Sequence, residues 1–331
     1  MTSNNEKCEK NLDQCFTCPS APCARLQELA QTFNYRRELP EKNGEEILAS
    51  GKEPDPRNKL NHLSGGEWLY FTKTLITTSY PSEYGHEIRK QHGANKPPRL
   101  MRELIEFFTT ENSLVLDPFA GVGGTLIGAA ICDPPRRCRG IEINREWIDI
   151  FGQIGRTYPE LPLGDIVQGD CREIMPGMPD ESIDFILTDP PYNLHFKRTM
   201  CNNRYQGFAN RKTDYNMEST EYGDLANLHS YGEYLEAVDQ VMTQCYRVLK
   251  RGAYMAVIVR NAYQNGRYIF THADIARVAE GINEGKGFIT KGEKVWYQAG
   301  TRLRPYGYPY SYVPNIVHQY ILIFQKPRET A

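Results

Sequence analysis

The short segment TDPPY, residues 188–192, combines an acid, a stiff turn and an aromatic ring. Two adjacent prolines end regular structure, because proline has a fixed φ and no amide hydrogen. The carboxylate of Asp189 can accept one N–H of an amino group, and the carbonyl of Pro190, held by Pro191, can accept the other. Tyr192 offers a flat face on which a base can stack, worth about 1–3 kcal/mol. The segment therefore predicts chemistry on an amino group attached to a flat ring.

The reaction that suits this segment is methyl transfer from a sulfonium to the amino nitrogen, by in-line displacement. An aryl amine is a poor nucleophile, because its lone pair is delocalised into the ring. Two acceptors pull the nitrogen toward a tetrahedral shape and hold it at attack distance, which can contribute several kcal/mol. A base in duplex DNA must first be flipped out of the stack. The purely structural alternative is a strand-ending turn with a buried aromatic ring.

A glycine-rich loop, VLDPFAGVGGT at residues 115–125, lies between an expected strand and an expected helix. In an open α/β sheet, ligands bind beyond the carboxyl ends of the strands. Gly121 and Gly123 allow a tight turn and a close approach of the backbone to a ligand. Asp117, at the end of the strand, can accept a hydrogen bond or face a cationic group. A tight strand–helix turn without a ligand is the alternative.

Two more acids end the next two expected strands. Glu142 can bind the ribose hydroxyls of a nucleoside, and Asp170 can reach an adenine amino group. The first loop lacks the GxGxxG spacing of dinucleotide binders and the GK[ST] of phosphate loops. An acidic nucleoside pocket without a phosphate cradle suits S-adenosylmethionine, which carries an ammonium and a cationic sulfur. We predict this cofactor, bound by Asp117, Phe119, Gly121, Gly123, Glu142 and Asp170.

The elements that must position these residues alternate along the chain. Expected helices span 97–109, 124–131, 145–158, 231–250 and 271–284, and expected strands span 113–117, 139–143, 166–170, 183–189, 253–259 and 316–326. This alternation predicts an α/β fold of the Rossmann-like class, with a mostly parallel twisted sheet and helices on both faces.

The bulk composition is that of a soluble globular protein, with 331 residues, 40% hydrophobic and 24% charged. Residues 1–65 are polar and rich in turn formers, and we expect a cysteine-containing extension and linker there, followed by a catalytic domain at 66–331. The sequence has no apolar run of membrane-spanning length, and its first residues lack the apolar core of a signal peptide. These features predict a cytoplasmic protein without a membrane partner.

Both motifs resemble those of the DNA amino-methyltransferases, the N6-adenine and N4-cytosine family. LDPFAGVGGT looks like the cofactor motif of this family, and TDPPYNL looks like its catalytic motif. The segment HGANKPPRLMRELIEFFT, residues 92–109, is similar to the segment that helps to hold the methionine end of the cofactor. The likeness covers roughly residues 68–326, including the final RPYGYPYSYVPNIVHQYILIFQK. One departure is Gly124, where the family more often has Ser or Thr, which should loosen the start of the helix.

The resemblance implies an S-adenosylmethionine-dependent DNA methyltransferase. The cofactor motif precedes the catalytic motif, which excludes the class of relatives with the opposite order. In the family, Asp before the two prolines favours adenine N6, and cytosine N4 stays open. C5-cytosine chemistry needs a Pro-Cys nucleophile, and Pro22-Cys23 lies far from the cofactor loop. Relatives that methylate RNA or a protein glutamine usually have Asn in place of Asp189. A hypothesis from another functional class is a non-catalytic DNA-binding protein. Whether the enzyme partners a restriction nuclease, serves a phage or acts alone stays open.

DNA contacts require a local basic patch, because the net charge of the chain is −2. The first candidate is the segment 193–230, where aromatic residues alternate with basic ones. A solvated loop is the alternative there. The second candidate is the segment 286–312, with Lys286, Lys291, Lys294, Arg302 and Arg304. The basic residues predicted to bind DNA in the first segment are Lys197, Arg198, Arg204, Arg211 and Lys212.

Four cysteines near the amino terminus could bind a metal. Cys8, Cys15, Cys18 and Cys23 lie within 16 residues, and four thiolates can bind Zn²⁺ tetrahedrally. An iron–sulfur cluster also takes four cysteines. Thiols in a loose tail are the alternative, and we favour a structural zinc site.

Overall fold

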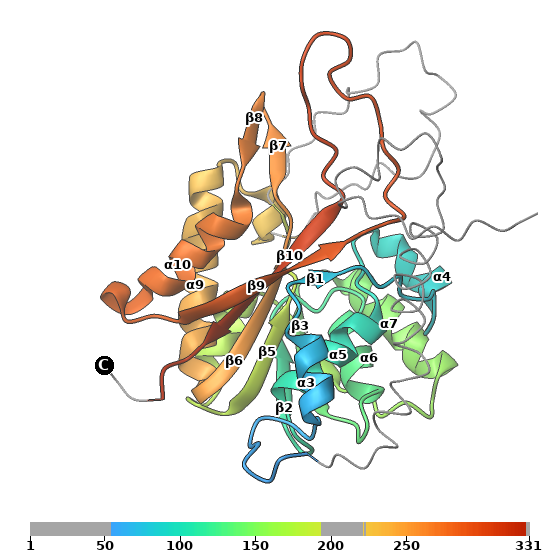
Figure 1. Cartoon of the computed structure of the whole chain (residues 1–331), viewed down its shortest axis with the longest axis vertical. Coiled ribbons are helices and arrows are strands. Elements are labelled where there is room, and N and C mark those ends of the chain that lie inside the picture. The colour runs from blue at the N-terminus through green and yellow to red at the C-terminus, as the bar shows by residue number, and fades with distance from the viewer. Residues whose placement is uncertain (1–53, 193–220, 222, 329–331) are drawn as a thin grey trace, which may run out of the picture. The chain divides into compact units, whose positions relative to one another are not determined.

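The computed structural model describes residues 54–192, 221 and 223–328 (Figure 1). Backbone contacts divide the chain into two units, one of Met1–Arg57 with Leu63–Leu69 and one of Asn58–His62 with Tyr70–Ala331. The described part of the first unit includes most of α3 (Gly65–Phe71). All elements that bear on the site belong to the second unit. The predicted domain boundary at residue 66 stays a prediction.

The second unit is built on an eight-stranded sheet with the order β1-β9-β10-β6-β5-β2-β3-β4. The five strands from β6 to β4 run parallel, and β10 is antiparallel to both β6 and β9. This arrangement confirms the predicted Rossmann-like class. The strands are β1 (Leu75–Ile76), β2 (Leu114–Asp117), β3 (Arg137–Glu142), β4 (Asp165–Gln168), β5 (Ile183–Thr188), β6 (Leu249–Val259), β9 (Ile289–Tyr297) and β10 (His318–Gln325).

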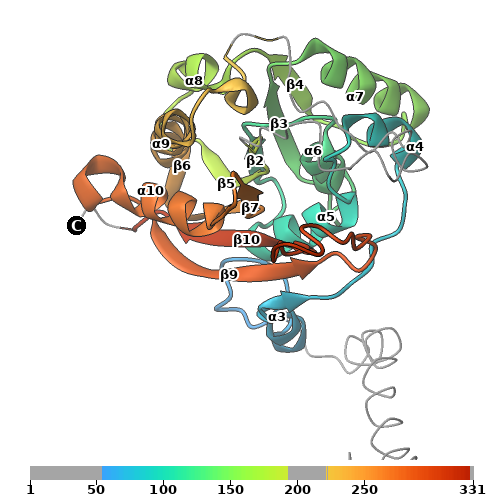
Figure 2. The same cartoon turned by 90° about the horizontal axis from the view of Figure 1, so that it is seen from above.

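Helices cover both faces of this sheet, with α5, α6 and α7 on one face and α8, α9 and α10 on the other (Figure 2). Because both faces are covered, the central strands are apolar throughout, and Ile186, Leu187 and Val257 have no exposed surface. The larger helices are α5 (Pro98–Phe108), α6 (Gly124–Ala130), α7 (Arg145–Thr157), α9 (Tyr231–Val248) and α10 (Thr271–Gly285).

Local sequence explains where several helices begin. Asn144 caps α7, since its side chain accepts a hydrogen bond from Glu146 N. Ser230 and Glu233 form a capping box at the start of α9. Proline at the start of α5 costs no hydrogen bond, because the first amides of a helix have no partner within it. The shorter elements are α4 (His86–Arg89), η1 (Lys90–His92), α8 (Cys171–Ile174), η2 (Met175–Gly177) and η4 (Leu225–Asn227).

Four strands of the second unit, β1, β7, β8 and β9, were not predicted. Strand β9 pairs with β10 and β1, and a separate hairpin joins β7 (Ala262–Gln264) to β8 (Arg267–Ile269). Strand β9 was missed because its residues include Lys291, Glu293 and Lys294, so its apolar alternation is weak. No helix in the part of the chain that the structure describes has the length and apolar character needed to cross a membrane.

Candidate active site

A cavity of about 660 Å³ opens at the carboxyl ends of β2, β3 and β5. The residues predicted to do the chemistry and those predicted to bind the cofactor lie apart in sequence, and the fold brings them to this one cavity. Of the residues predicted to do the chemistry or to bind the cofactor, Gly123 alone is absent from the lining. The predicted residues in the lining are Asp117, Phe119, Gly121, Glu142, Asp170, Asp189, Pro190, Pro191 and Tyr192.

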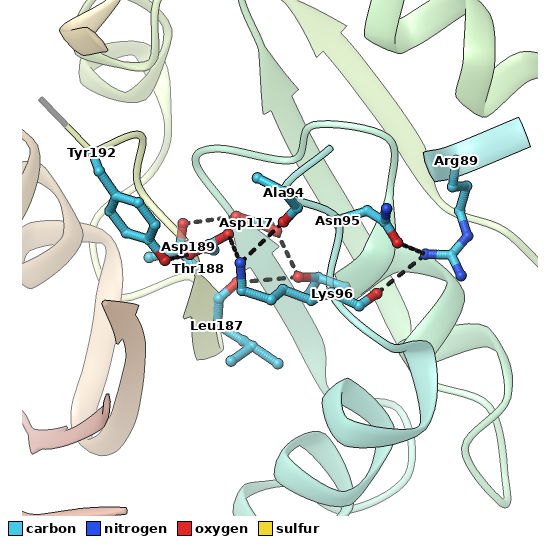
Figure 3. Close-up of polar contacts among 10 residues, drawn as sticks. Arg89, Ala94, Asn95, Lys96, Asp117, Leu187, Thr188, Asp189 and Tyr192 are labelled. Atoms are coloured by element: carbon cyan, nitrogen blue, oxygen red, sulfur yellow. Dashed lines mark hydrogen bonds and ion pairs between the residues drawn. The ribbon is translucent and has the colours of Figure 1, made fainter. Parts of the chain in front are cut away.

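The four residues Asp189–Tyr192, which were predicted to be catalytic and are called the catalytic segment below, begin directly after β5. One carboxylate oxygen of Asp189 accepts a hydrogen bond from the Tyr192 hydroxyl at 2.6 Å. The other forms an ion pair with the ammonium of Lys96 (Figure 3). The Lys96 side chain is 5% exposed and that of Asp189 is 15% exposed, so the pair is largely shielded from water. Tyr192 is also buried.

Lys96 is a site residue that was not predicted from the sequence. It lies in the segment 92–109, directly before the two prolines that open α5. A lysine in a segment that resembles part of a cofactor site was the feature of the sequence that could have identified it. Its ammonium also donates to the carbonyl of Ala94 at 3.0 Å. The buried guanidinium of Arg89 donates to the Lys96 carbonyl at 3.1 Å and to the Asn95 side chain at 3.3 Å. Arg89 thereby fixes the backbone that carries Lys96.

Asp117 has a role that the sequence did not predict. Its carboxylate accepts hydrogen bonds from the hydroxyls of Thr125, at 2.5 Å, and Thr188, at 2.7 Å, and from the amide of Phe119, at 3.1 Å. Burial raises the pKa of Asp117 to about 6. Thr188 is followed in the chain by Asp189. Asp117 therefore connects the glycine-rich loop to the strand end that carries the catalytic segment.

The two glycines of the loop act differently. Gly121 lines the cavity, and its amide donates to Glu142 at 2.7 Å. Gly123 has a φ of +78°, in the left-handed region that favours glycine, and a Cβ there would collide with the ring of Phe151. Gly123 therefore allows the chain to turn into α6. It does not line the cavity, so the cofactor role predicted for it stays a prediction.

The other two predicted acids of the cofactor site are held by protein donors. Glu142 accepts hydrogen bonds from the amides of Gly121, at 2.7 Å, and Asn144, at 2.8 Å. Burial raises the pKa of Glu142 to about 7. Asp170 caps α8 and forms an ion pair with Arg172, with 2.6 Å between its oxygen and the guanidinium nitrogen. Both carboxylates are thereby oriented at the ends of adjacent strands.

His92 and Trp147 also line the cavity, and neither was predicted. Their rings meet edge to face with 4.7 Å between centroids. Burial, with a smaller contribution from the charge of Lys96, lowers the pKa of His92 to about 4, so the imidazole is neutral at physiological pH. Its Nδ1 atom is buried and has no hydrogen-bond partner within the described residues. A neutral imidazole with a spare nitrogen can bind a polar group of a ligand in this cavity.

The second predicted DNA segment, 286–312, is divided by the fold. Lys294 lies on β9 and is buried, and its ammonium donates to the carbonyls of Phe71 and Lys73. Burial lowers the pKa of Lys294 to about 8. Lys294 is therefore a structural residue, whereas Arg302 and Arg304 lie in the loop between β9 and β10.

Several predicted residues lie outside the described part of the chain. They are the basic residues Lys197, Arg198, Arg204, Arg211 and Lys212 and the cysteines Cys8, Cys15, Cys18 and Cys23. The zinc site therefore stays a prediction without support from the structure. Among the residues described, no group of three or more His, Cys, Asp or Glu could hold a metal ion. Cys132, Cys138, Cys171 and Cys245 are free, buried thiols.

The sequence matches the model of the N6/N4 DNA methylase family over residues 7–153 and 183–331. It is 31% identical over 96 residues to a tRNA (guanine(10)-N2)-dimethyltransferase of Pyrococcus abyssi (strain GE5 / Orsay). This alignment covers 29% of the chain and 28% of that protein. It is 29% identical over 98 residues to the type II methyltransferase M.BamHI of Bacillus amyloliquefaciens, which covers 29% of the chain and 18% of that protein. The matches thus span less than a third of either relative.

Among solved structures, the fold is similar to that of TrmN from Thermus thermophilus. The TM-score is 0.47 and the sequence identity is 15%, over 75% of the chain and 54% of TrmN.

Proposed function

Because the chain belongs to the N6/N4 DNA methylase family, we propose that it methylates the exocyclic amino group of a flipped base in DNA, N6 of adenine. The alternative acceptor is N4 of cytosine. The observation that carries the proposal is the single cavity lined by both the Asp-Pro-Pro-Tyr segment and the glycine-rich loop. A methyl donor and an amino acceptor must meet at one point, and this cavity provides it.

The cavity fits S-adenosylmethionine in both size and chemistry. Its volume of about 660 Å³ is in the usual range for a site that holds a ligand of this size. Glu142 and Asp170 offer carboxylate acceptors to the hydroxyl and amino groups of a nucleoside, and His92 offers a neutral nitrogen. When bound, the cofactor supplies an electrophilic methyl group on a sulfonium.

The catalytic segment orients the acceptor amine. Asp189 accepts one N–H of the target amino group and the Pro190 carbonyl accepts the other, so the nitrogen lone pair is directed at the methyl carbon. Each oxygen of a carboxylate has two lone pairs. The Tyr192 hydroxyl uses one on one oxygen and the Lys96 ammonium uses one on the other. Asp189 therefore keeps the capacity to accept the amino hydrogen and then the proton that the methylated nitrogen releases.

The function is tested by transfer of a labelled methyl group to methylation-free genomic DNA, followed by digestion to nucleosides and mass analysis. N6-methyldeoxyadenosine is the expected product, and N4-methyldeoxycytidine would support the alternative acceptor. A parallel reaction with unmodified tRNA is needed, because one relative is named a tRNA dimethyltransferase. Label in tRNA and not in DNA would overturn the substrate class. Label in neither, with cofactor binding intact, would favour a non-catalytic DNA-binding protein.

Glu142 predicts a pH dependence of cofactor binding. Its pKa of about 7 means that the carboxylate is lost as the pH falls through neutrality, and with it an acceptor for the ribose hydroxyls. We expect the affinity for S-adenosylmethionine to fall about fourfold from about pH 8.5 to about pH 6.5, measured by calorimetry. The Glu142→Gln variant should bind more weakly at high pH and show a flatter profile. An unchanged profile in this variant would contradict the role of Glu142.

The same shift has the opposite effect on the stability of the cofactor-free protein. Folding raises the pKa of Glu142 from 4.5 to about 7, so the folded state binds more protons than the unfolded state between these values. The contribution of Glu142 to stability therefore falls as the pH rises through this range. Asp117, whose pKa is raised to about 6, also stabilises the protein less as the pH rises. Most of Asp117 has lost its proton above about pH 6.5, so the affinities for S-adenosylmethionine are best compared above that pH.

A further inference from the structure

The loop between β9 and β10, residues 298–317, carries an unusual group of exposed aromatic residues. We call this loop the tyrosine finger. Tyr308, Tyr310 and Tyr312 are 80%, 92% and 84% exposed. The loop contains Arg302 and Arg304 and no acidic residue. In Figure 1 it is the long red loop that extends beyond the ends of β9 and β10.

The tyrosine finger is held in shape by its own hydrogen bonds. At its base, the amide of Gln298 donates to the carbonyl of Val317 at 2.8 Å. Further out, the Asn315 side chain accepts from the amide of Arg304 at 2.9 Å and donates to its carbonyl at 2.8 Å.

At the tip of the finger, the amides of Tyr310 and Ser311 donate to the carbonyl of Gly307 at 2.7 and 2.8 Å. The rings are therefore presented to solvent on an ordered loop. Exposed apolar groups that are gathered in this way mark a binding surface, and their prior ordering lowers the cost of binding.

The strand registers place the base of the finger near the catalytic segment. Tyr320 of β10 is paired with Val259 of β6, and Val257 of β6 is paired with Thr188 of β5. The start of β10 and Asp189 therefore lie at the same edge of the sheet, two strands apart. With about 4.8 Å between neighbouring strands, roughly 10 Å separates the strands β10 and β5 that carry them.

Two properties of the tyrosine finger favour nucleic acid as its partner. Two arginines without a nearby acid in the loop suit a phosphate backbone, and tyrosine rings stack on bases. A base that rotates by about 180° out of the duplex leaves its neighbours unstacked. Other proteins that distort DNA insert apolar side chains between bases.

We propose that the tyrosine finger docks on duplex DNA beside the target base and that its exposed rings fill the gap left when this base is flipped. This proposal rests on the proposed function, because it supposes that the base enters the cavity from a duplex. Arg302 contacts the phosphate backbone and fixes the finger on the DNA, while the rings of Tyr308, Tyr310 and Tyr312 replace the lost stacking.

The test is a triple variant, Tyr308→Ala/Tyr310→Ala/Tyr312→Ala, assayed on native and on heat-denatured methylation-free genomic DNA. We expect kcat/KM on native DNA to fall about tenfold or more, because stacking is lost. On denatured DNA, where no gap forms, we expect a change of less than about twofold. The triple Tyr→Phe variant keeps the rings and should match the wild type. The matched control is Ile289→Ala, which removes an exposed apolar side chain at the opposite edge of the sheet.

Direct binding to a labelled duplex separates stacking from charge. The triple Ala variant should weaken binding without changing its salt dependence, whereas Arg302→Gln should reduce the salt slope by about one. Thermal unfolding checks that the variants fold, and Tyr310→Ala alone is the second variant if the triple one does not.

The outcomes distinguish the two proposals. Wild-type transfer with an unaffected triple Ala variant would overturn the role of the finger and leave the function standing. An equal loss on native and denatured DNA would overturn the assignment to a duplex gap. If the wild type binds duplex through the rings but transfers no methyl group to DNA, the proposed function fails and the docking surface stands. If the wild type neither binds nor methylates DNA, both fail.

Discussion

Replacement of Asp189 by alanine is expected to abolish methyl transfer, with a loss of about a thousandfold or more. The variant removes the acceptor that holds the amino nitrogen in line with the methyl carbon. Cofactor affinity should change by less than about threefold, because Asp189 orients the target amine, whereas the nucleoside of the cofactor is bound by Glu142 and Asp170. Single-turnover transfer of labelled methyl to DNA measures the first quantity and calorimetry with S-adenosylmethionine measures the second.

Two controls make this result interpretable. Asp189→Ala leaves the buried ammonium of Lys96 without its partner, so part of any loss could come from destabilisation. The double variant Asp189→Ala/Lys96→Met removes both charges and should recover thermal stability without recovering transfer. Asp239→Ala, an exposed acid on α9, should behave as the wild type. Undiminished transfer by a folded Asp189→Ala variant would refute the mechanism.

Replacement of Lys96 by methionine is expected to reduce the single-turnover rate about a hundredfold, the cost of a small misplacement in a reacting site. Methionine keeps most of the length of the side chain and removes the charge. The carboxylate of Asp189, which is 15% exposed, then loses its countercharge and keeps only the Tyr192 hydroxyl as an orienting partner.

A split between rate and affinity tests this role for Lys96. The resemblance of residues 92–109 to a segment that holds the methionine end implies another role for Lys96, as a partner of the cofactor carboxylate. If Lys96→Met raises the cofactor Kd and leaves the single-turnover rate intact, the positioning role fails. Lys90→Met is the matched control, because Lys90 is an exposed lysine of the same region and its side chain is 55% exposed.

Much of the fold followed from periodicity in the sequence. The helices predicted over 145–158 and 231–250 are α7 and α9, which end one and two residues earlier. The strand predicted over 253–259 is β6, which begins at Leu249. These elements have strong local signals, in their apolar spacing and their caps. Strand β9 has no such signal, and it is a strand because β10 and β1 pair with it.

The sequence by itself contains the residues on which the proposed chemistry rests. Asp189, the two prolines and Tyr192 are contiguous, and the glycine-rich loop is a local turn, so residue type and spacing were enough to predict an amine acceptor and a nucleoside cofactor. It also determined that both motifs end parallel strands, because strands that alternate with helices must form such a sheet.

Only the tertiary structure decided the partners of these residues. Lys96 meets Asp189 across 93 positions of sequence, and Thr188 meets Asp117 across 71. The base of the tyrosine finger lies at the same end of the sheet as the catalytic segment because β10 runs antiparallel beside β6. Contacts of this range depend on how the strands are ordered in the sheet. No local pattern of residues specifies that order, and for this reason the countercharge of Asp189 and the position of the finger became visible only in the folded protein.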